Sequence, residues 1–267
     1  MMAHRVELIA GQRIFTSFIP VEGNLMIEKN ATSVVEFIQL VLSIKESWYP
    51  DGRGPDLWFR GVKDARFELL PGAYFRPKCN EQSIVLFFRS QSPSLLPREP
   101  SDDWEWYYLM QHYGIPTRLL DWTENPLSAL YFALEVEAPG SSPCVWVIDP
   151  LSLNRLSGIN NILLPYPNTD LDYWLPDNCG RHRNVHTFEP DNLFPDNSKP
   201  LAIYPKRHNP RIVAQRGVFT VHGMDETPIN KLPLTDEAEQ DSRIAKIVFD
   251  PQVKAYLNQH LWILGIT

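Results

Sequence analysis

Apolar residues recur at intervals of three and four along several segments of the chain, which is the spacing of one face of a helix. The helices predicted on this basis are about 33–48, 81–91, 101–114, 125–137 and 251–265. Capping residues stand where two of these helices begin. Ser33 precedes Glu36 in a capping-box arrangement. Asn125 or Thr123 can cap the helix that starts at Pro126, a residue that suits the first helical position.

Shorter apolar and β-branched segments lie between the predicted helices and indicate strands. They are 55–61, 144–149, 217–222 and 243–249. Helices and strands mix without a strict βαβ order, so the expected fold class is α+β, with a mixed sheet and flanking helices in a single main domain. We place this domain at residues 31–267, after an N-terminal extension of residues 1–30. Within it, residues 150–210 are rich in Pro, Asn and Asp, which predicts a loop-rich insertion with short helical turns.

The composition is that of a folded globular protein, because 43% of the 267 residues are hydrophobic. The formal net charge of −7 argues against a broad basic surface for nucleic acid, although it leaves room for a local basic patch. Cys79, Cys144 and Cys179 are odd in number and far apart, so we expect no disulfide framework and a cytoplasmic protein. No uninterrupted apolar run reaches the ~18 residues of a membrane span, so no membrane partner is expected.

Polar residues capable of chemistry gather between two predicted helices, within residues 111–125. Residues 116–124 are predicted to be a connection that leads to a helix N-terminus, whose free N–H groups attract an anion. His112 lies in the last turn of the preceding helix and could act as an acid or a base, although a lone histidine is more often a packed residue. Thr123 and Asn125 are expected to cap the next helix, a role that is compatible with contact to a phosphate.

The arginines and carboxylates of this region leave alternatives open. Arg60 ends an aromatic strand and could bind a phosphate or a ribose oxygen, or form a buried ion pair with Asp121 or Glu124. Arg118 and Asp121 could lock the connection with a salt bridge, or Arg118 could contact a ligand. Gln215 precedes a predicted strand and could hydrogen-bond a ribose or a carboxamide.

The sequence lacks several familiar binding and catalytic motifs. Neither a Walker A motif, nor GxGxxG, nor the GxSxG signature of hydrolases occurs in it. Cys179, His182 and His186 have a spacing that can bind zinc, but only these three ligands are local. A polar loop is the better interpretation of this segment, and no metal is expected.

Blocks of the sequence also carry a family resemblance. They are LWFRG (57–61), QHYGIPTRLLDWTENPLSALYFA (111–133) and AQRGVFT (214–220). These blocks resemble the FRG domain family, which is named for its Phe-Arg-Gly motif, here residues 59–61. The resemblance runs from about residue 30 to the C-terminus. A Leu-Phe-Pro-Asp-Leu-like segment that usually follows the family's last helix does not follow Gly265, as expected of a truncated chain or a short variant.

The blocks are similar, more distantly, to ADP-ribosyltransferases, which implies an ADP-ribosyltransferase-like core and NAD as the cofactor. The LWFRG block is similar to the first core strand of these enzymes, so Arg60 would bind the NAD phosphate or ribose. Thr123 would stand on the nicotinamide side, in place of the middle residue of a Ser-Thr-Ser motif. The AQRGVFT block is similar to the last core strand, where Gln215 stands in place of a catalytic glutamate. Asp121 or Glu124 would then supply the negative charge that stabilises the transition state.

The resemblance implies an effector in a bacterial toxin or phage-defence setting that binds NAD or another nucleotide and acts on a protein or nucleic-acid acceptor. We assign catalysis to His112, Asp121, Glu124 and Gln215, and ligand binding to Arg60, Arg118, Thr123 and Asn125. The alternatives are a non-catalytic nucleotide or nucleic-acid sensor, a metal-dependent nuclease that uses His112 and Asp121, and a protein-interaction module. The last would use the aromatic surface of Trp104, Trp106, Tyr107 and Tyr108, although the spacing of these residues fits a core helix better.

Overall fold

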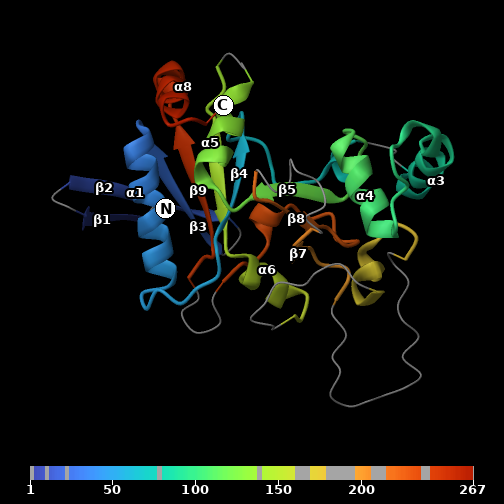
Figure 1. Ribbon diagram of the computed structural model, residues 1–267. Coiled ribbons are helices and arrows are strands. Elements are labelled where there is room, and N and C mark those ends of the chain that lie inside the picture. The colour runs from blue at the N-terminus through green and yellow to red at the C-terminus, as the bar shows by residue number, and fades with distance from the viewer. Residues whose placement is uncertain are drawn as a thin grey trace.

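The computed structural model of the chain contains one sheet, to which nine strands contribute within the described residues (Figure 1). The described residues are 3–9, 12–21, 24–76, 80–136, 140–159, 169–178, 196–205, 215–235 and 241–266. From one edge of the sheet to the other, the strands are β1 (Ala3–Ile9), β2 (Gln12–Val21), β3 (Asn24–Ala31), β9 (Ile244–Phe249), β6 (Cys144–Ile148), β4 (Trp58–Val62), β5 (Leu119–Thr123), β8 (Gly217–Val221) and β7 (Leu201–Ile203).

The sheet is mixed, because β3 and β9 run parallel while the other neighbouring pairs are antiparallel. Together with the helices around it, this sheet confirms the predicted α+β class. The junction between β4 and β5 is short, since Phe59 and Thr123 form its only registered residue pair within the described strands. Thr123 is the last residue of β5, so the registered pairing of the two strands is confined to that end, and Arg60 and Asp121 next to it line the cavity described below.

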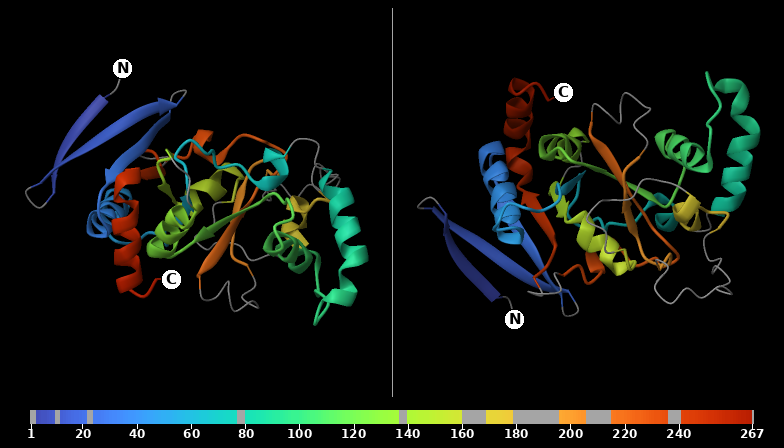
Figure 2. Two further views of the ribbon diagram at one scale, coloured as in Figure 1. Left: turned by 90° about the horizontal axis from the view of Figure 1, so that it is seen from above. Right: turned by 60° about the horizontal axis from the view of Figure 1, so that its bottom comes forward.

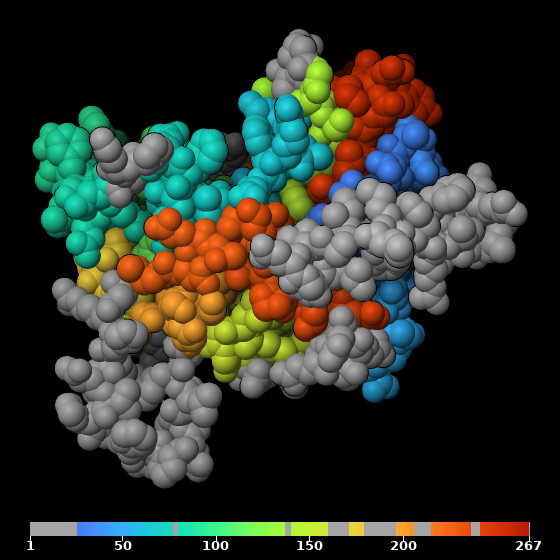
Figure 3. Space-filling view, turned by 180° about the vertical axis from the view of Figure 1, so that it is seen from behind, coloured from blue at the N-terminus to red at the C-terminus, as the bar shows by residue number. Residues whose placement is uncertain are grey.

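Helices cover the sheet in two groups (Figure 2). Helices α1 (Val34–Trp48), α5 (Pro126–Glu135) and α8 (Lys254–Ile263) pack on the part of the sheet formed by β9, β6 and β4. Helices α3 (Glu81–Gln91) and α4 (Asp103–His112) pack near β5, β8 and β7 at the other end. The short helices are α2 (Gly72–Phe75), α6 (Pro150–Leu156), η1 (Pro93–Leu95), η2 (Thr169–Trp174), η3 (Ile229–Lys231) and η4 (Pro251–Val253). Figure 3 shows the surfaces of α1 and α8 next to each other, seen from behind.

The central strands are buried on both faces. In β6, Val145 and Val147 pack under α1, α5 and α8, whereas Trp146 and Ile148 pack in a second cluster on the opposite face. The continuous apolar run that predicted this strand is therefore explained by two-sided burial. A third cluster joins α3 and α4 to β8, with Phe219 on the sheet side.

A glycine permits the closest contact between a helix and the sheet. A Cβ atom on Gly61 in β4 would lie 1.8 Å from the carbonyl oxygen of Ala129 in α5. No side chain can occupy that space, so the third residue of the Phe-Arg-Gly motif allows α5 to pack directly on the strand that carries Arg60. This close packing fixes the position of α5 relative to β4 and to Arg60.

The helical pattern predicted most elements well. The helix expected at 81–91 has those bounds, and the ends of the other predicted helices differ from the observed ones by a few residues. Asn125 caps α5, with its Oδ1 accepting from the Leu127 amide at 3.0 Å. The aromatic residues of α4 are buried, as a core helix requires, with Trp104 3% and Tyr107 2% exposed.

The prediction that residues 116–124 form a connection is wrong, because Leu119–Thr123 is strand β5 in the interior of the sheet. The segment is short and carries a charge at Asp121, and because of both features its sequence does not show the pattern of a buried strand. Adjacent Leu119 and Leu120 are nonetheless both buried and belong to different apolar clusters, since neighbouring side chains point to opposite faces of a strand.

The predicted insertion at 150–210 contains α6, η2 and β7 within its described parts. Strands β1 to β3 occupy the segment predicted as an N-terminal extension, and β3 pairs with β9. Cys179, His182 and His186, which carry the zinc-like spacing, lie outside the described residues. In the described part of the chain, no helix combines the length and the apolar character that crossing a membrane requires.

Candidate functional site

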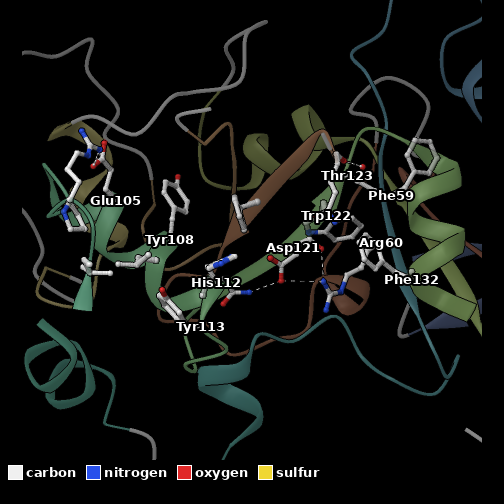
Figure 4. Close-up of a pocket in the computed structure, with 18 of the residues that line it drawn as sticks. Phe59, Arg60, Glu105, Tyr108, His112, Tyr113, Asp121, Trp122, Thr123 and Phe132 are labelled. Carbon is white, nitrogen blue, oxygen red and sulfur yellow. Dashed lines mark hydrogen bonds and ion pairs between the residues drawn. The ribbon is translucent and has the colours of Figure 1, made fainter. Parts of the chain in front are cut away.

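A cavity of about 810 Å³ opens between α4 and the middle of the sheet. One wall comes from β4, β5 and the start of β8, and another from α4 and the segment that precedes it (Figure 4). Phe132 of α5 contributes at the far end. The aromatic and polar lining residues are Phe59, Arg60, Arg98, Glu105, Tyr108, Gln111, His112, Tyr113, Asp121, Trp122, Thr123, Phe132, Gln215 and Phe219.

Arg60 lies on β4, directly after the residue that pairs with β5. Its Nη1 donates to the carbonyl oxygen of Asp121 at 2.6 Å and lies 4.0 Å from the Asp121 carboxylate oxygen Oδ2. No hydrogen bond joins its Nε or Nη2 to the described residues, and a quarter of its side chain is exposed. Burial lowers the pKa of Arg60 and Asp121 opposes this shift, yet an arginine keeps its charge at neutral pH. One side of the guanidinium is thus held by the strand, and the other is available to an anion.

Asp121 presents its carboxylate to the cavity from the middle of β5. Its side chain is 57% exposed, although both of its strand neighbours are buried. The Gln111 amide nitrogen Nε2 donates to Oδ2 at 2.6 Å, and Thr117 in turn donates to the amide oxygen of Gln111 at 2.5 Å. Figure 4 shows Asp121 between His112 and Arg60, with dashed lines on both sides of its carboxylate region.

Thr123 and Gln215 meet where β5 ends and β8 begins. The Thr123 hydroxyl donates to the Gln215 carbonyl oxygen at 2.6 Å and accepts from the Asn125 amide at 3.0 Å. Between this contact and β8, Arg216 adopts a φ of 46°, the only left-handed non-glycine conformation among the described residues. The Glu124 amide donates to the Arg216 carbonyl oxygen at 3.1 Å, which holds the turn. The backbone strain at Arg216 lies next to the cavity, where strained residues are often found.

His112 and Tyr113 are exposed at the end of α4 and line the same cavity. Their rings contact each other edge to face, with centroids 5.4 Å apart. The histidine therefore has access to a ligand as a proton donor or acceptor.

Arg118 lies outside the cavity lining, in a closed polar cluster. Its Nε donates to Glu81 Oε2 at 2.7 Å, and its Nη1 and Nη2 donate to the carbonyl oxygens of His222 and Trp174 at 2.8 and 2.5 Å. The Tyr107 hydroxyl accepts from the Arg118 amide at 2.7 Å. Arg118 is only 2% exposed and forms its ion pair with Glu81 of α3, while the Asp121 carboxylate faces Arg60. The alternative of a local salt bridge between Arg118 and Asp121 is therefore wrong.

The side chain of His222 shares this closed cluster. Burial, with a smaller contribution from Arg118, lowers its pKa to about 3, and Asp225 acts in the opposite direction. Within the described residues, neither ring nitrogen has a hydrogen-bond partner. His222 is therefore a neutral buried side chain at physiological pH.

Glu124 and Asn125 do not line the cavity. The Glu124 carboxylate accepts from the Tyr204 hydroxyl at 2.7 Å. The Asn125 side chain is occupied as the cap of α5, where its Oδ1 faces the Leu127 and Ser128 amides. The cavity therefore brings together Arg60, His112, Asp121, Thr123 and Gln215 from the predicted site, and leaves Arg118, Glu124 and Asn125 outside.

Sequence reasoning missed several residues of the site. Gln111 and Thr117 lie in the same block of polar residues, but nothing in their spacing showed that Gln111 would contact Asp121 or that Thr117 would contact Gln111. Tyr108, Phe132 and Phe219 supply apolar walls from three separate elements. Tyr108 and Phe219 pack with ring centroids 5.1 Å apart, and burial raises the pKa of Tyr108 well above its usual value. Apolar lining residues at a cavity carry the same sequence pattern as core residues.

The described residues contain no group of three or more His, Cys, Asp and Glu side chains placed to hold a metal ion. His112 and Asp121 line the cavity together, but a third ligand of this kind does not join them in that part of the chain.

Residues 55–141 match the family model described as the FRG domain. The matched segment includes β4, α4, β5 and α5, and thus Arg60, His112, Asp121 and Thr123, while Gln215 lies beyond it. No curated protein and no solved structure matches the chain. The chain therefore carries an FRG domain, and that domain supplies most of the cavity.

Proposed function

We propose that the FRG domain of this chain binds NAD or a related nucleotide in the cavity and transfers ADP-ribose from it. One observation carries the proposal. The three segments that are similar to the NAD-binding and catalytic strands of ADP-ribosyltransferases lie on β4, β5 and β8, which are adjacent in the sheet. Arg60, Thr123 and Gln215 consequently line one cavity, although 155 positions separate the first from the last.

The cavity has the chemistry that a nucleotide requires. Arg60 offers guanidinium N–H groups that the described residues leave unbonded, and a planar guanidinium recognises phosphate oxygens well. Phe59, Phe132 and Phe219 provide apolar surface against which a flat base or a nicotinamide ring can pack. The volume of about 810 Å³ lies within the range of small-molecule binding pockets.

Asp121 supplies the carboxylate that the transfer requires. When the bond between the ribose carbon and nicotinamide breaks, the bonding electrons leave with nicotinamide and positive charge develops on the ribose. A carboxylate aimed at that carbon stabilises this charge. Asp121 lines the cavity, whereas Glu124 is bonded to Tyr204 outside it, so Asp121 takes this role in the proposal. The acceptor then attacks the ribose carbon, and its proton passes to His112, which lines the same wall.

The test combines binding and catalysis on the same protein. We expect NAD and ADP-ribose to raise the melting temperature, and NAD to release nicotinamide. Asp121→Asn keeps the shape of the side chain but removes its charge, and we expect it to lower the rate of nicotinamide release about 100- to 1000-fold. Glu124→Gln is the matched control, since it removes a neighbouring charge outside the cavity, and its rate should stay close to that of the unchanged protein.

A result in which Asp121→Asn retains full nicotinamide release, or in which NAD neither binds nor reacts, contradicts the proposal. Binding of NAD or ADP-ribose without any nicotinamide release would favour the second candidate, a non-catalytic nucleotide sensor. The observation behind that candidate is the amide side chain of Gln215 at the position where a carboxylate would be expected. If the protein transfers ADP-ribose, it would act as an effector in a bacterial toxin or phage-defence setting, on a protein or nucleic-acid acceptor.

A further inference from the structure

We infer that Gln111 and Thr117 form a hydrogen-bond relay that positions the Asp121 carboxylate for its reaction. The inference rests on the proposed function, because it assigns a purpose to the orientation of Asp121. It adds two positioning residues to the site, neither of which is required to touch the ligand.

The Asp121 carboxylate determines the direction of the relay, because it can only accept hydrogen bonds, and Thr117 forms the far end of the relay. The Thr117 side chain is fully buried, in the segment between α4 and β5. The Leu119 amide donates to the Thr117 hydroxyl oxygen at 3.1 Å, and the hydroxyl lies 2.5 Å from the amide oxygen of Gln111. Since Gln111 must present its NH₂ group to Asp121, its amide oxygen faces Thr117, and the single hydroxyl proton of Thr117 is donated to that oxygen.

Both contacts of Gln111 agree on one orientation of its amide. With its oxygen directed to Thr117, the amide can present only its NH₂ group to the other side, where Oδ2 of Asp121 lies 2.6 Å away. Gln111 comes from the last turn of α4 and Asp121 from β5. The relay thus connects a helix, a connecting segment and a strand through side chains whose donors and acceptors are matched at each step.

The relay leaves the functional groups of the cavity available. It holds Oδ2 of Asp121 with a neutral donor, so the carboxylate is fixed without being neutralised by a close ion pair. Oδ1 accepts no hydrogen bond from the described residues, and the side chain is 57% exposed to the cavity. An exposed aspartate without such a contact would change rotamer freely. Because the carboxylate is already held in one orientation, the reaction does not bear the entropic cost of ordering it, which is the usual benefit of preorganisation.

Arg60 does not replace the relay. Within the described residues, its hydrogen bond goes to the backbone carbonyl of Asp121, and its closest approach to the carboxylate is 4.0 Å. That distance exceeds the range of a hydrogen bond. The guanidinium is therefore left to a ligand anion, while Gln111 orients the carboxylate.

The test uses substitutions that change the relay one contact at a time. Thr117→Ser keeps the hydroxyl and Thr117→Val removes it with little change in shape. Gln111→Met removes the amide, and Gln91→Met is its matched control, because Gln91 is exposed on α3 and does not line the cavity. We expect Thr117→Val and Gln111→Met to lower kcat for nicotinamide release about 10- to 100-fold with little change in KM. Thr117→Ser and Gln91→Met should retain the kcat of the unchanged protein.

A second readout needs no ligand and no activity. In the relay, the side-chain NH₂ of Gln111 is hydrogen-bonded and oriented, so its proton resonances should exchange slowly with water. We expect Thr117→Val and Asp121→Ala each to increase that exchange at least several-fold, whereas Thr117→Ser should not. Melting temperatures of all variants separate this local effect from loss of the fold.

The two readouts separate failure of the relay from failure of the proposed function. If NAD does not react with the unchanged protein while the Gln111 resonances behave as expected, the function is wrong and the relay stands as a structural feature. If Asp121→Asn is inactive but folded Thr117→Val and Gln111→Met retain full kcat, Asp121 acts without positioning and the inference is overturned. The inference is also overturned if exchange of the Gln111 amide is insensitive to both Thr117→Val and Asp121→Ala.

Discussion

Arg118 and Asp121 lie three positions apart in the chain, but the polar clusters around them differ in exposure and in hydrogen bonding. Around Arg118, the side chain is 2% exposed and all three guanidinium nitrogens donate to the protein. Around Asp121, the carboxylate is 57% exposed, and it accepts a bond at one oxygen only within the described residues. We call these the closed cluster, formed by Arg118, Glu81, Tyr107, His222 and Trp174, and the open cluster, formed by Asp121, Gln111, Thr117 and Arg60.

The comparison shows what distinguishes a structural polar group from a functional one. A buried charge is stable only when its hydrogen-bonding capacity is satisfied by the protein, and that is the state of the closed cluster. A ligand-binding group leaves some of its hydrogen-bond donors or acceptors unbonded to the protein. This costs little free energy because water can bond them until the ligand binds. The charge of a residue alone does not separate the two cases, since Arg60 and Arg118 were equally strong candidates by sequence.

The largest effect should come from making the same substitution in each cluster. Arg118→Met leaves the largely buried Glu81 carboxylate without its ion-pair partner, and we expect a loss of about 3 kcal/mol in the free energy of unfolding. Arg60→Met removes the hydrogen bond to the Asp121 carbonyl at a partly exposed site, and we expect a loss of about 1 kcal/mol. Urea unfolding at neutral pH measures both. Equal losses would erase the distinction between the clusters.

A second effect, of intermediate size, tests whether the cost of Arg118→Met comes from the unpaired charge. Adding Glu81→Leu removes the carboxylate that Arg118→Met leaves buried, and we expect the double variant to recover about 1–2 kcal/mol relative to Arg118→Met alone. The same urea titration applies. If Glu81→Leu makes Arg118→Met still less stable, the loss arises from the unbonded carbonyl oxygens of His222 and Trp174 and not from the carboxylate.

A pH-dependent effect should appear in the closed cluster through His222. Its pKa is about 3 in the folded protein and near 6.5 when unfolded, so the unfolded chain binds more protons in between. The stability from neutral His222 is fully present above pH 6.5 and is lost as the pH falls toward 3. Protonation of one such group changes the unfolding free energy by at most about 1.4 kcal/mol per pH unit.

His222→Leu provides the comparison for that titration. Because the ring nitrogens of His222 have no hydrogen-bond partner in the described residues, leucine should be tolerated at pH 7.5. We expect the unfolding free energy of His222→Leu to fall less steeply than that of the unchanged protein between pH 6.5 and 4. Parallel curves would show that other groups account for the acid sensitivity.

The smallest effect on stability, with a large effect on binding, is expected in the open cluster. Arg60→Ala should abolish the rise in melting temperature caused by NAD or ADP-ribose while leaving the ligand-free melting temperature within a few degrees of that of the unchanged protein. Thermal denaturation with and without each ligand measures both quantities. If Arg60→Ala instead unfolds the protein, Arg60 belongs with Arg118 as a structural residue.

The predictable part of this protein is local. Helix α3 and the Asn125 cap followed from apolar spacing and capping residues, because those signals act over a few neighbouring positions. Strand β6 followed from its uninterrupted apolar run. Strand β5 did not, because five residues with a charge in the middle resemble a connection until two other strands pair with them. Strands β1 to β3 were missed, although Val6, Glu7 and Leu8 show the alternation of a strand.

The sequence by itself determined the mixed α+β class, the boundaries of the long helices and the FRG motif that places Gly61 against α5. It also showed that Arg60, Asp121 and Arg118 were candidates for one site. Only the tertiary structure decided that Arg118 is closed by partners 37 to 104 positions away, while Asp121 faces a cavity. Whether protein partners satisfy all the hydrogen-bonding groups of a polar side chain depends on contacts between segments distant in sequence. Those contacts exist only when the sheet and its helices have packed together.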